Sequence, residues 1–473
     1  MGKDSAQGLS QDAKVKTINL GGSEEDLAEQ ALGVSRVIRF KEAASRRVPP
    51  ALRYPAYRTY WLGTLASVSG FQMLTFGILW VTYELTQSPL FLGYVAAVNA
   101  LPAIALNLFG GVFADMFDKR RLIIACQLVT ATLIFILALM TMFDVLHIYY
   151  LLLIAFFAGA VNAFDQPARQ ALYPHLIDRS VMMSAVSLNA AIWQGTRIVA
   201  PAFAGFIIAY LGTSTSFFIS GAGFVTMAVV IAAIKLPEIP RGGSGNAARD
   251  LLDGMKFIAG NSVFSFLIGM TFFNSFFGMA YIFMMPIFAV EILKVGADGQ
   301  GILMGVGGVG ALVTTMLLGS IGNFRQKGLM LIGGAVAFGV ALLLFGLTSQ
   351  VYPSYYLVMA IMLFIGIFNS IYMISIMSSL QMMVPNSMRG RVMGFYGMTW
   401  SIMPLGGMQG NWIANYLGAP MAVIIGGVAV IAFAVGPAML NRQVRNISTL
   451  LNQVEQVMAA GRQQAQPTAP SGD

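Results

Sequence analysis

The chain has 473 residues, of which 57% are hydrophobic and 10% are charged. Soluble domains carry about 25% charged residues, so this composition excludes a soluble enzyme. Two histidines and one cysteine are too few for a disulfide framework or a clustered metal site, and we expect no metal and no cofactor. The net charge of +8 does not indicate nucleic acid, because the cations fall between apolar runs and not on a soluble basic face.

Continuous apolar runs dominate the chain. A helix needs around 20 apolar residues to cross a hydrocarbon layer of about 30 Å, because its amides must be bonded within the segment. Twelve such runs occur, at roughly 60–84, 90–114, 122–143, 148–173, 181–211, 214–235, 262–290, 298–320, 329–348, 354–380, 391–417 and 420–440. They lack the two-residue alternation of a β-barrel. The pattern predicts an all-α polytopic membrane protein with twelve transmembrane helices.

The basic residues predict the orientation of these helices. Short cytoplasmic loops carry an excess of Lys and Arg, and 26 of the 28 cations fall in the two terminal segments and in alternate loops. The opposite loops contain only Lys294, and Arg197 lies within a predicted helix. We therefore expect a multi-pass protein of the cytoplasmic (inner or plasma) membrane with both termini cytoplasmic. The polar start of the chain does not predict a cleaved signal peptide.

An internal repeat relates the two halves of the chain. When the chain is aligned with itself at an offset of 206 to 208 residues, Gly111–Asp115 falls on residues 319–323. In the same alignment the second half has residues identical to Lys119, Asn162 and Tyr210-Leu211-Gly212. The segment between the halves is rich in proline and glycine, as linkers are. We expect six-helix bundles at 54–235 and 262–441, a cytoplasmic linker at 236–261, and polar cytoplasmic tails at 1–53 and 442–473.

One loop sequence resembles a known family. Gly-Val-Phe-Ala-Asp-Met-Phe-Asp-Lys-Arg-Arg at 111–121 resembles the signature between the second and third helices of the major facilitator superfamily, with Met116 and Asp118 departing from it. The segments 162–171 and 195–205 resemble bacterial exporters of the enterobactin-exporter type. The resemblance covers about residues 55–440. It implies two pseudo-symmetric bundles and a latch of the inward-closed state formed by Gly111, Asp115, Lys119 and Arg120. A positive-inside anchor is the alternative role of the cations.

The fourth predicted helix carries three polar residues on one face, namely Asn162, Asp165 and Arg169. Arg197, on the next helix, reaches a similar depth to Asp165. A charge in hydrocarbon costs roughly 3 kcal/mol or more, so Arg197 needs a partner or a wet cavity, and Asp165 is the candidate partner. Two interpretations stay open: a proton- or substrate-responsive site, and a permanent bridge between the helices.

The fifth predicted helix resembles the antiporter motif of the superfamily through Pro201 and Gly205. This resemblance implies export, and we place Arg169 with Pro201 and Gly205 among the residues of the conformational switch. In the resembled fold the first, fourth, seventh and tenth helices line the path. The candidate substrate-binding residues are accordingly Gln72, Asn162, Asp165, Arg197, Phe273, Asn274, Phe277, Tyr281, Asn369 and Tyr372. Contact with lipid is the alternative role of the aromatic side chains.

These observations favour a secondary exporter and not an enzyme. We expect alternating access that moves a small amphiphilic solute, siderophore-like or drug-like, with proton antiport as the energy source because the sequence contains no P-loop. An importer or a lysolipid flippase of the same fold is the alternative. A polytopic membrane enzyme is disfavoured, because the two histidines are predicted on opposite sides of the membrane. We expect a monomer in the lipid bilayer, no catalytic residues and no nucleic-acid partner.

Overall fold

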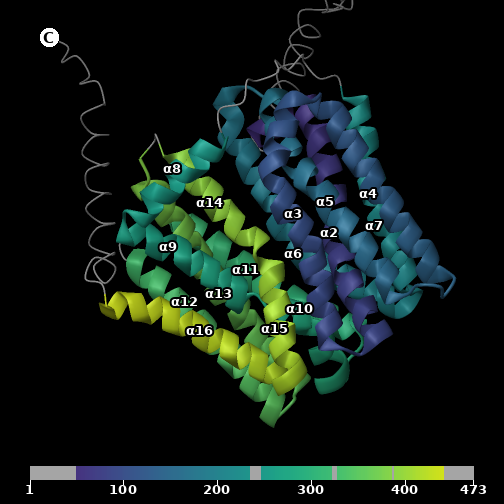
Figure 1. Ribbon diagram of the computed structural model, residues 1–473, viewed down its shortest axis with the longest axis vertical. Coiled ribbons are helices and arrows are strands. Elements are labelled where there is room, and N and C mark those ends of the chain that lie inside the picture. Colours follow the sequence, from purple (N-terminus) through teal and green to yellow (C-terminus); the bar gives the residue numbers. More distant parts are fainter. Residues whose placement is uncertain (1–48, 235–246, 322–326, 386–387, 441–473) are drawn as a thin grey trace, which may run out of the picture.

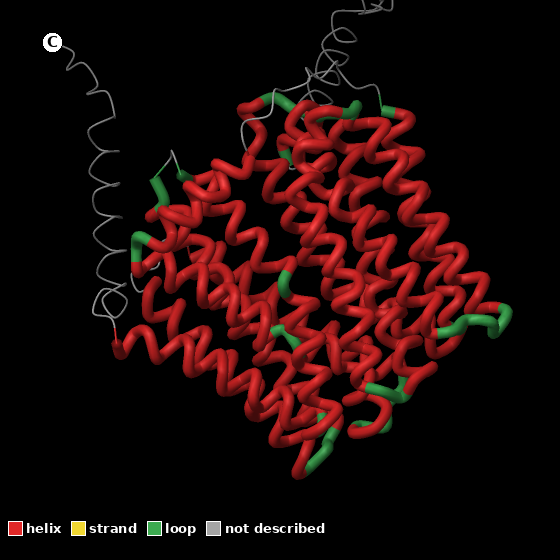
Figure 2. Tube along the Cα trace, viewed as in Figure 1, coloured by secondary structure: helices red, strands yellow, loops and turns green. Residues whose placement is uncertain are grey.

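The computed structural model describes residues 49–234, 247–321, 327–385 and 388–440, and these residues form helices joined by short turns, with no strand among them (Figure 2). Most of the N-terminal tail, the first half of the predicted linker and the C-terminal tail lie outside the described residues. Eleven of the described helical stretches are long and apolar enough to cross a membrane. The predicted all-α membrane fold is confirmed.

The first bundle contains six helices. They follow a short 3-10 turn at Pro50–Arg53, and they are α2 (Pro55–Thr86), α3 (Pro89–Met116), α4 (Lys119–Met142), α5 (Ile148–Leu172), α6 (Met182–Leu211) and α7 (Thr213–Ala233). Pro55 and Pro89 stand at helix starts, where a missing N–H costs nothing. Within the bundle, α3 packs against α5, and α7 packs against both α2 and α4. Short 3-10 turns at Tyr173–Leu176 and Arg179–Val181 connect α5 to α6.

The second bundle contains interrupted helices. Its regular members are α11 (Ala297–Ile321), α12 (Lys327–Val351), α13 (Tyr355–Met383) and α16 (Ala419–Leu440). The seventh crossing combines α9 (Ser262–Phe273) and α10 (Tyr281–Ile287) with π-helical turns at Asn274–Gly278 and Phe288–Ile292. The eleventh predicted span is split into α14 (Arg389–Ser401) and α15 (Met403–Leu417), which together run the length of the bundle (Figure 1). Pro404 lies in the first turn of α15 and cannot donate a backbone hydrogen bond to α14, which explains the break.

Equivalent points of the two halves have the same backbone. Gly212 ends α6 with φ 85° and ψ 160°, and Gly418 ends α15 with φ 85° and ψ 153°. This conformation is favourable only for glycine. Likewise α4 begins at Lys119 and α12 at Lys327. The repeat found in the sequence is therefore a repeat of backbone structure at these positions.

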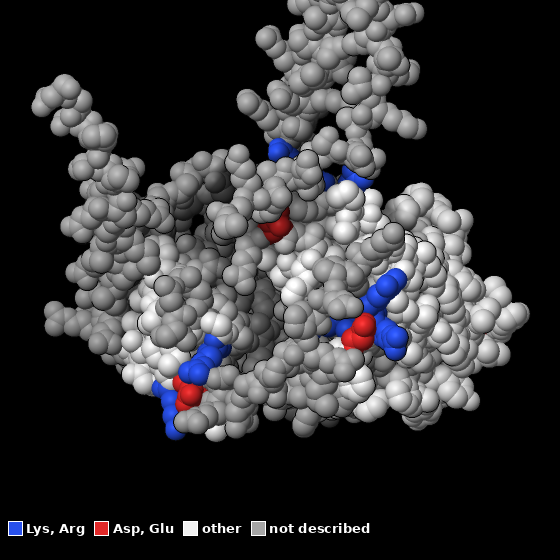
Figure 3. Space-filling model, turned by 90° about the horizontal axis from the view of Figure 1, so that it is seen from above, with Lys and Arg blue, Asp and Glu red and all other residues white. Residues whose placement is uncertain are grey.

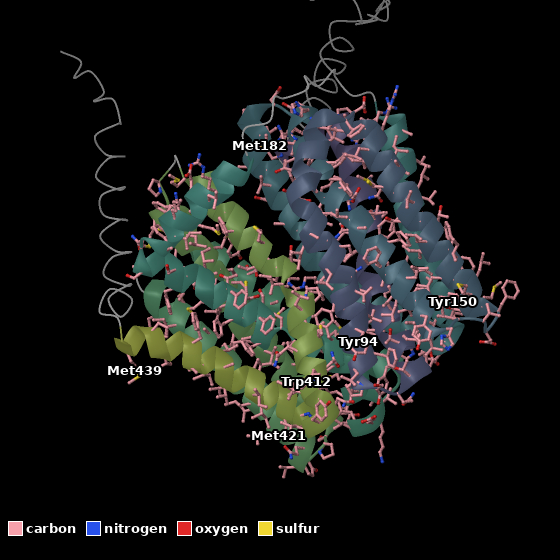
Figure 4. All side chains as sticks on the ribbon, in the orientation of Figure 1. Tyr94, Tyr150, Met182, Trp412, Met421 and Met439 are labelled. Carbon is pink, nitrogen blue, oxygen red and sulfur yellow. The ribbon has the colours of Figure 1, made fainter. Side chains whose placement is uncertain are left out.

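The two bundles lie side by side and touch at one end (Figure 1). The contacts join α3 to α15 and α6 to α11. A Cβ on Gly205 would lie 2.3 Å from the carbonyl oxygen of Ala297, and one on Gly93 would lie 3.2 Å from Met408. Tyr94 and Trp412, neighbours of this second contact, lie at the same end of the molecule in Figure 4. Glycine thus allows the backbones of opposite bundles to approach closely.

The bundles separate toward the other end, where α6 begins at Met182 (Figure 4). A Cβ on Gly195 of α6, or on Gly394 or Gly397 of α14, would meet no atom within 4 Å. Small groups of basic and acidic side chains lie at this end in the view of Figure 3. The structure is therefore open at the end that the charge distribution predicts to be cytoplasmic.

The second half of the predicted linker is a helix and not an irregular segment. This helix, α8 (Ala247–Ala259), has one apolar and one polar side and packs against α14. Asp253 forms an ion pair with Arg391 of α14 at 3.4 Å, and a Cβ on Gly254 would lie 2.9 Å from the ring of Phe395. The connection between the halves is thereby fixed to the second bundle.

The contact at Gly205 yields a stability prediction. Gly205→Ala places a methyl group against the backbone of α11, and overpacking of this kind costs about 1–3 kcal/mol. We expect a lower unfolding temperature of the purified protein in detergent. Gly195→Ala, on the same helix but facing open space, should leave the unfolding temperature unchanged or raise it slightly. Equal effects of the two substitutions would contradict the close approach of α6 and α11.

Candidate functional site

A cavity of about 200 Å³ lies between the bundles, mostly against the first one. All six helices of the first bundle contribute to its wall, α4 and α7 through Thr130 and Phe224. Phe283 of α10 and Met403 and Pro404 of α15 close it from the second bundle. Most of the wall is apolar and aromatic, including Phe71 and Trp193. The amide side chains that interrupt it are Gln72, Asn99, Asn162 and Gln166. Such a wall suits a solute with apolar surface and a few hydrogen-bonding groups.

Four buried polar side chains form a hydrogen-bonded ring, of which Asp165 and Arg169 line the cavity. Arg169 Nε lies 2.8 Å from Asp165 Oδ2, and the amide of Gln127 donates to Asp165 Oδ1 at 2.9 Å. The hydroxyl of Ser67 donates to Gln127 Oε1 at 3.1 Å, and Arg169 Nη1 donates to Ser67 Oγ at 3.4 Å. The ring joins α2, α4 and α5, and it leaves the carboxylate with a counter-charge and a hydrogen bond.

The predicted pairing of Asp165 with Arg197 is wrong. Arg169 lies one helical turn from Asp165 on the same face of α5 and forms the ion pair instead. Gln127 binds the second carboxylate oxygen from α4. Arg197 lies in the middle of α6, is partly exposed, and is not among the residues that line the cavity. The bridge that the structure shows therefore connects α5 to α4 and α2, and not α5 to α6.

The structure brings only some of the predicted substrate-binding residues together. Gln72, Asn162 and Asp165 line the cavity, as does Arg169. The candidates from the second bundle do not line the cavity. Phe273 stacks on Phe277 and on Phe433 of α16, with 3.9 Å between the ring centroids of Phe273 and Phe433. Tyr372 is fully buried in the core of the second bundle. The amide of Asn274 and the side-chain oxygen of Asn369 have no hydrogen-bond partner among the described residues.

The structure describes only part of the predicted latch. Asp118 caps α4 by accepting a hydrogen bond from the Arg121 backbone amide at 2.9 Å. Gly111 and the side chain of Asp115 are outside the described part of α3. Lys119 begins α4 and is buried, and Arg120 donates to the carbonyl oxygen of Ala232 of α7. Aspartate before a basic helix start is an N-cap signal that the sequence contained.

At the closed end, Tyr83 of α2 donates a hydrogen bond to the carboxylate of Glu291 on the seventh crossing. This bond joins the two bundles, and the two residues are 208 positions apart, which is the repeat offset. Tyr83 is buried, whereas Glu291 is exposed. Tyr83 could not be recognised from the sequence, because a single tyrosine near a helix end has no distinguishing pattern.

Comparisons with known proteins agree with this arrangement. A family profile described as transmembrane secretion effector matches residues 48–462. The staphyloferrin A transporter of Staphylococcus aureus is 25% identical over 78% of this chain and 92% of its own length. Macrolide efflux protein A of Streptococcus pyogenes is 21% identical over 81% of this chain and 96% of its own.

Solved structures share the fold. The nucleoside transporter NupG aligns with a TM-score of 0.61 at 12% identity, over 81% of this chain and 98% of its own. A bacterial homologue of the human lysosomal transporter Spinster, inward-facing and unoccupied, aligns with a TM-score of 0.58 at 14% identity, over 86% of this chain and 98% of its own. At these identities the likeness concerns the fold alone.

The buried ring yields a second prediction. Asp165→Asn leaves the Arg169 guanidinium without its counter-charge, and we expect a loss of about 3 kcal/mol, the lower end of the range for a broken buried pair, because the cavity admits water. The double variant Asp165→Asn/Arg169→Gln should recover most of that loss in a denaturant titration of the purified protein. A double variant as unstable as Asp165→Asn alone would contradict the pairing.

The bond at the closed end yields a third prediction. Tyr83→Phe removes a hydrogen bond to an exposed carboxylate, worth about 0.5–1 kcal/mol. The fraction of molecules whose bundles are separated at this end should therefore rise about two- to fivefold. Ala204 is buried at the contact of α6 with α11, so the maleimide labelling rate of an Ala204→Cys reporter should rise by the same factor. The single native cysteine, Cys126, is buried and gives little background. Tyr94→Phe is the control, and an unchanged rate in Tyr83→Phe would refute the closing role.

Proposed function

Since this chain belongs to the transmembrane secretion effector family of major facilitator transporters, we propose that it exports a small amphiphilic solute by alternating access, driven by proton antiport. The chain is a multi-pass membrane transporter of small molecules with efflux-type relatives. The printed functions of those relatives concern a siderophore, staphyloferrin A, and macrolides. They support a siderophore-like or drug-like solute.

The single observation that carries the proposal is the ion pair of Asp165 and Arg169 at the wall of the cavity. Asp165 is buried among Arg169 and Gln127 yet faces the space in which a solute would lie. A proton on the Asp165 carboxylate removes its charge and so weakens its hold on Arg169. It also removes the attraction of this carboxylate for a hydrogen-bond donor or a cationic group of a solute, so a solute held there is released. A proton and a solute thus compete for one polar network, which is the coupling that an antiporter requires.

The contacts between the bundles support rigid-body alternation. The bundles meet along glycine-rich strips at Gly205 and Gly93 and are open at the opposite end. Rocking about the cavity would separate these strips, break the Tyr83 to Glu291 bond and bring α6 and α14 together. Few interactions must change for this movement, because the closed end rests mainly on backbone packing. We propose that the open end faces the cytoplasm of a bacterial cell, with both termini on that side, and that the protein acts as a monomer.

A transport assay in proteoliposomes tests this function. With a radiolabelled macrolide and staphyloferrin A as separate probes, we expect a pH gradient to drive saturable movement of at least one out of the side with the open cavity. Asp165→Asn should reduce pH-driven transport about tenfold or more and spare counterflow without a gradient. Asp118→Asn is the matched control, because asparagine also caps a helix.

Each outcome separates the proposal from its alternatives. Full pH-driven transport by Asp165→Asn would refute the coupling role of this carboxylate. Saturable movement only in the opposite direction would indicate an importer, and movement of lysolipid alone would indicate a flippase of the same fold. Conversion of a probe into a new compound would indicate a membrane enzyme.

A further inference from the structure

The apolar side of α8 is wider than the surface that packs on the second bundle. On the packed part, Ile258 is buried in the bundle core, and a Cβ on Gly254 would lie 2.9 Å from the ring of Phe395 on α14. Helical spacing places Met255 beside Ile258, and Leu252 beside Met255. Yet Leu252 is 51% exposed and Met255 is 42% exposed. An apolar face that continues past the contact with the protein is typical of an interaction surface.

The last turn of α8 lies level with the first turn of a membrane span. That span begins at Ser262. In its first turn, the hydroxyl of Ser265 donates to the carbonyl oxygen of Ile258 at 2.7 Å, and the ring centroids of Phe257 and Phe264 lie 5.1 Å apart. Figure 1 shows α8 at the open end of the second bundle, on the side of α14 away from the first bundle. At this level and on this outer side, a membrane protein is surrounded by lipid headgroups.

The charges around this face favour an anionic headgroup. Lys256 is exposed and lies one helical turn after Leu252, so it borders the apolar face. The nearby carboxylate of Asp253 is paired with Arg391 of α14. A lysine in this place can lay its apolar stem along acyl chains and hold its ammonium among the headgroups. Along the sequence, α8 and the first turn of α14 carry more cations than carboxylates: Arg249, Lys256, Arg389 and Arg391 against Asp250 and Asp253.

We infer that α8 is an interfacial helix that binds anionic phospholipid of the surrounding bilayer. Leu252 and Met255 enter the boundary of the acyl chains, and Lys256 binds the phosphate of the headgroup. The lipid thereby anchors α8 and, through the pair of Asp253 with Arg391, the start of α14 at the membrane surface. This surface is independent of the proposed transport function, because lipid covers it whether or not the cavity holds a solute.

Lipid contact is tested by quenching of an NBD label on the full-length protein in nanodiscs of phosphatidylcholine and phosphatidylglycerol. The quencher is a lipid with a nitroxide near the headgroup end of its acyl chain. It should quench a label on Met255→Cys about twofold or more strongly than one on Ser180→Cys, in the exposed turn between α5 and α6. Iodide in the water should show the reverse order. Quenching of the Met255→Cys label by iodide alone, or by neither quencher, would overturn the inference.

The headgroup preference is tested with nitroxide-labelled phosphatidylglycerol and phosphatidylcholine, supplied in turn at the same mole fraction. We expect phosphatidylglycerol to quench the Met255→Cys label more strongly. Lys256→Gln should lower this enrichment about two- to fivefold, and Lys256→Arg should keep it. Lys294→Gln, at an exposed lysine of the closed end, is the matched control and should change nothing. Equal quenching by the two lipids, or full enrichment in Lys256→Gln, would overturn the binding of anionic lipid.

Discussion

The cost of placing charge in hydrocarbon governs this structure. Each transmembrane helix bonds its own backbone amides, so the few ionised side chains within the membrane need partners or water. Asp165 and Arg169 satisfy each other on one face of α5, with Gln127 and Ser67 completing their hydrogen bonds. All four side chains are buried, and Asp165 and Arg169 line the cavity. The charges are thus concentrated where a transported solute and water would meet them.

The two bundles have different internal organisation, which matters for a moving structure. The first has six uninterrupted helices and contains the polar ring, and it contributes most of the cavity wall. The second has π-helical turns in its seventh crossing and a break before Pro404 in its eleventh. Such irregularities are typical of functional segments. The first bundle therefore holds most of the polar wall on regular helices, and the irregular backbone lies in the second bundle.

The sequence predicted the fold well because hydropathy is a local property. The spans, the repeat and the shared face of Asn162, Asp165 and Arg169 all follow from composition or from fixed spacing. The partner of Asp165 could not be predicted in this way. Residue spacing gives the depth of a side chain and the helix face it lies on, but it does not decide whether the carboxylate pairs with a cation one turn away or with one on a neighbouring helix. Gln127 could not be recognised as a member of the ring, since one amide in an apolar run has no pattern. The stacking of Phe273 on Phe433 of α16 was equally undetermined, because apolar residues occur on every side of the seventh crossing.

The movement of the bundles can be measured directly by the distances between pairs of spin labels. Gly195 and Gly394 lie on opposite bundles beside open space, whereas Tyr94 and Trp412 are exposed next to the closed contact. When protons or a solute are added, the account predicts that the first distance shortens as the second lengthens, while Tyr150 and Tyr210, both in the first bundle, stay at a constant separation. Unchanged distances for both cross-bundle pairs under every condition would contradict alternating access.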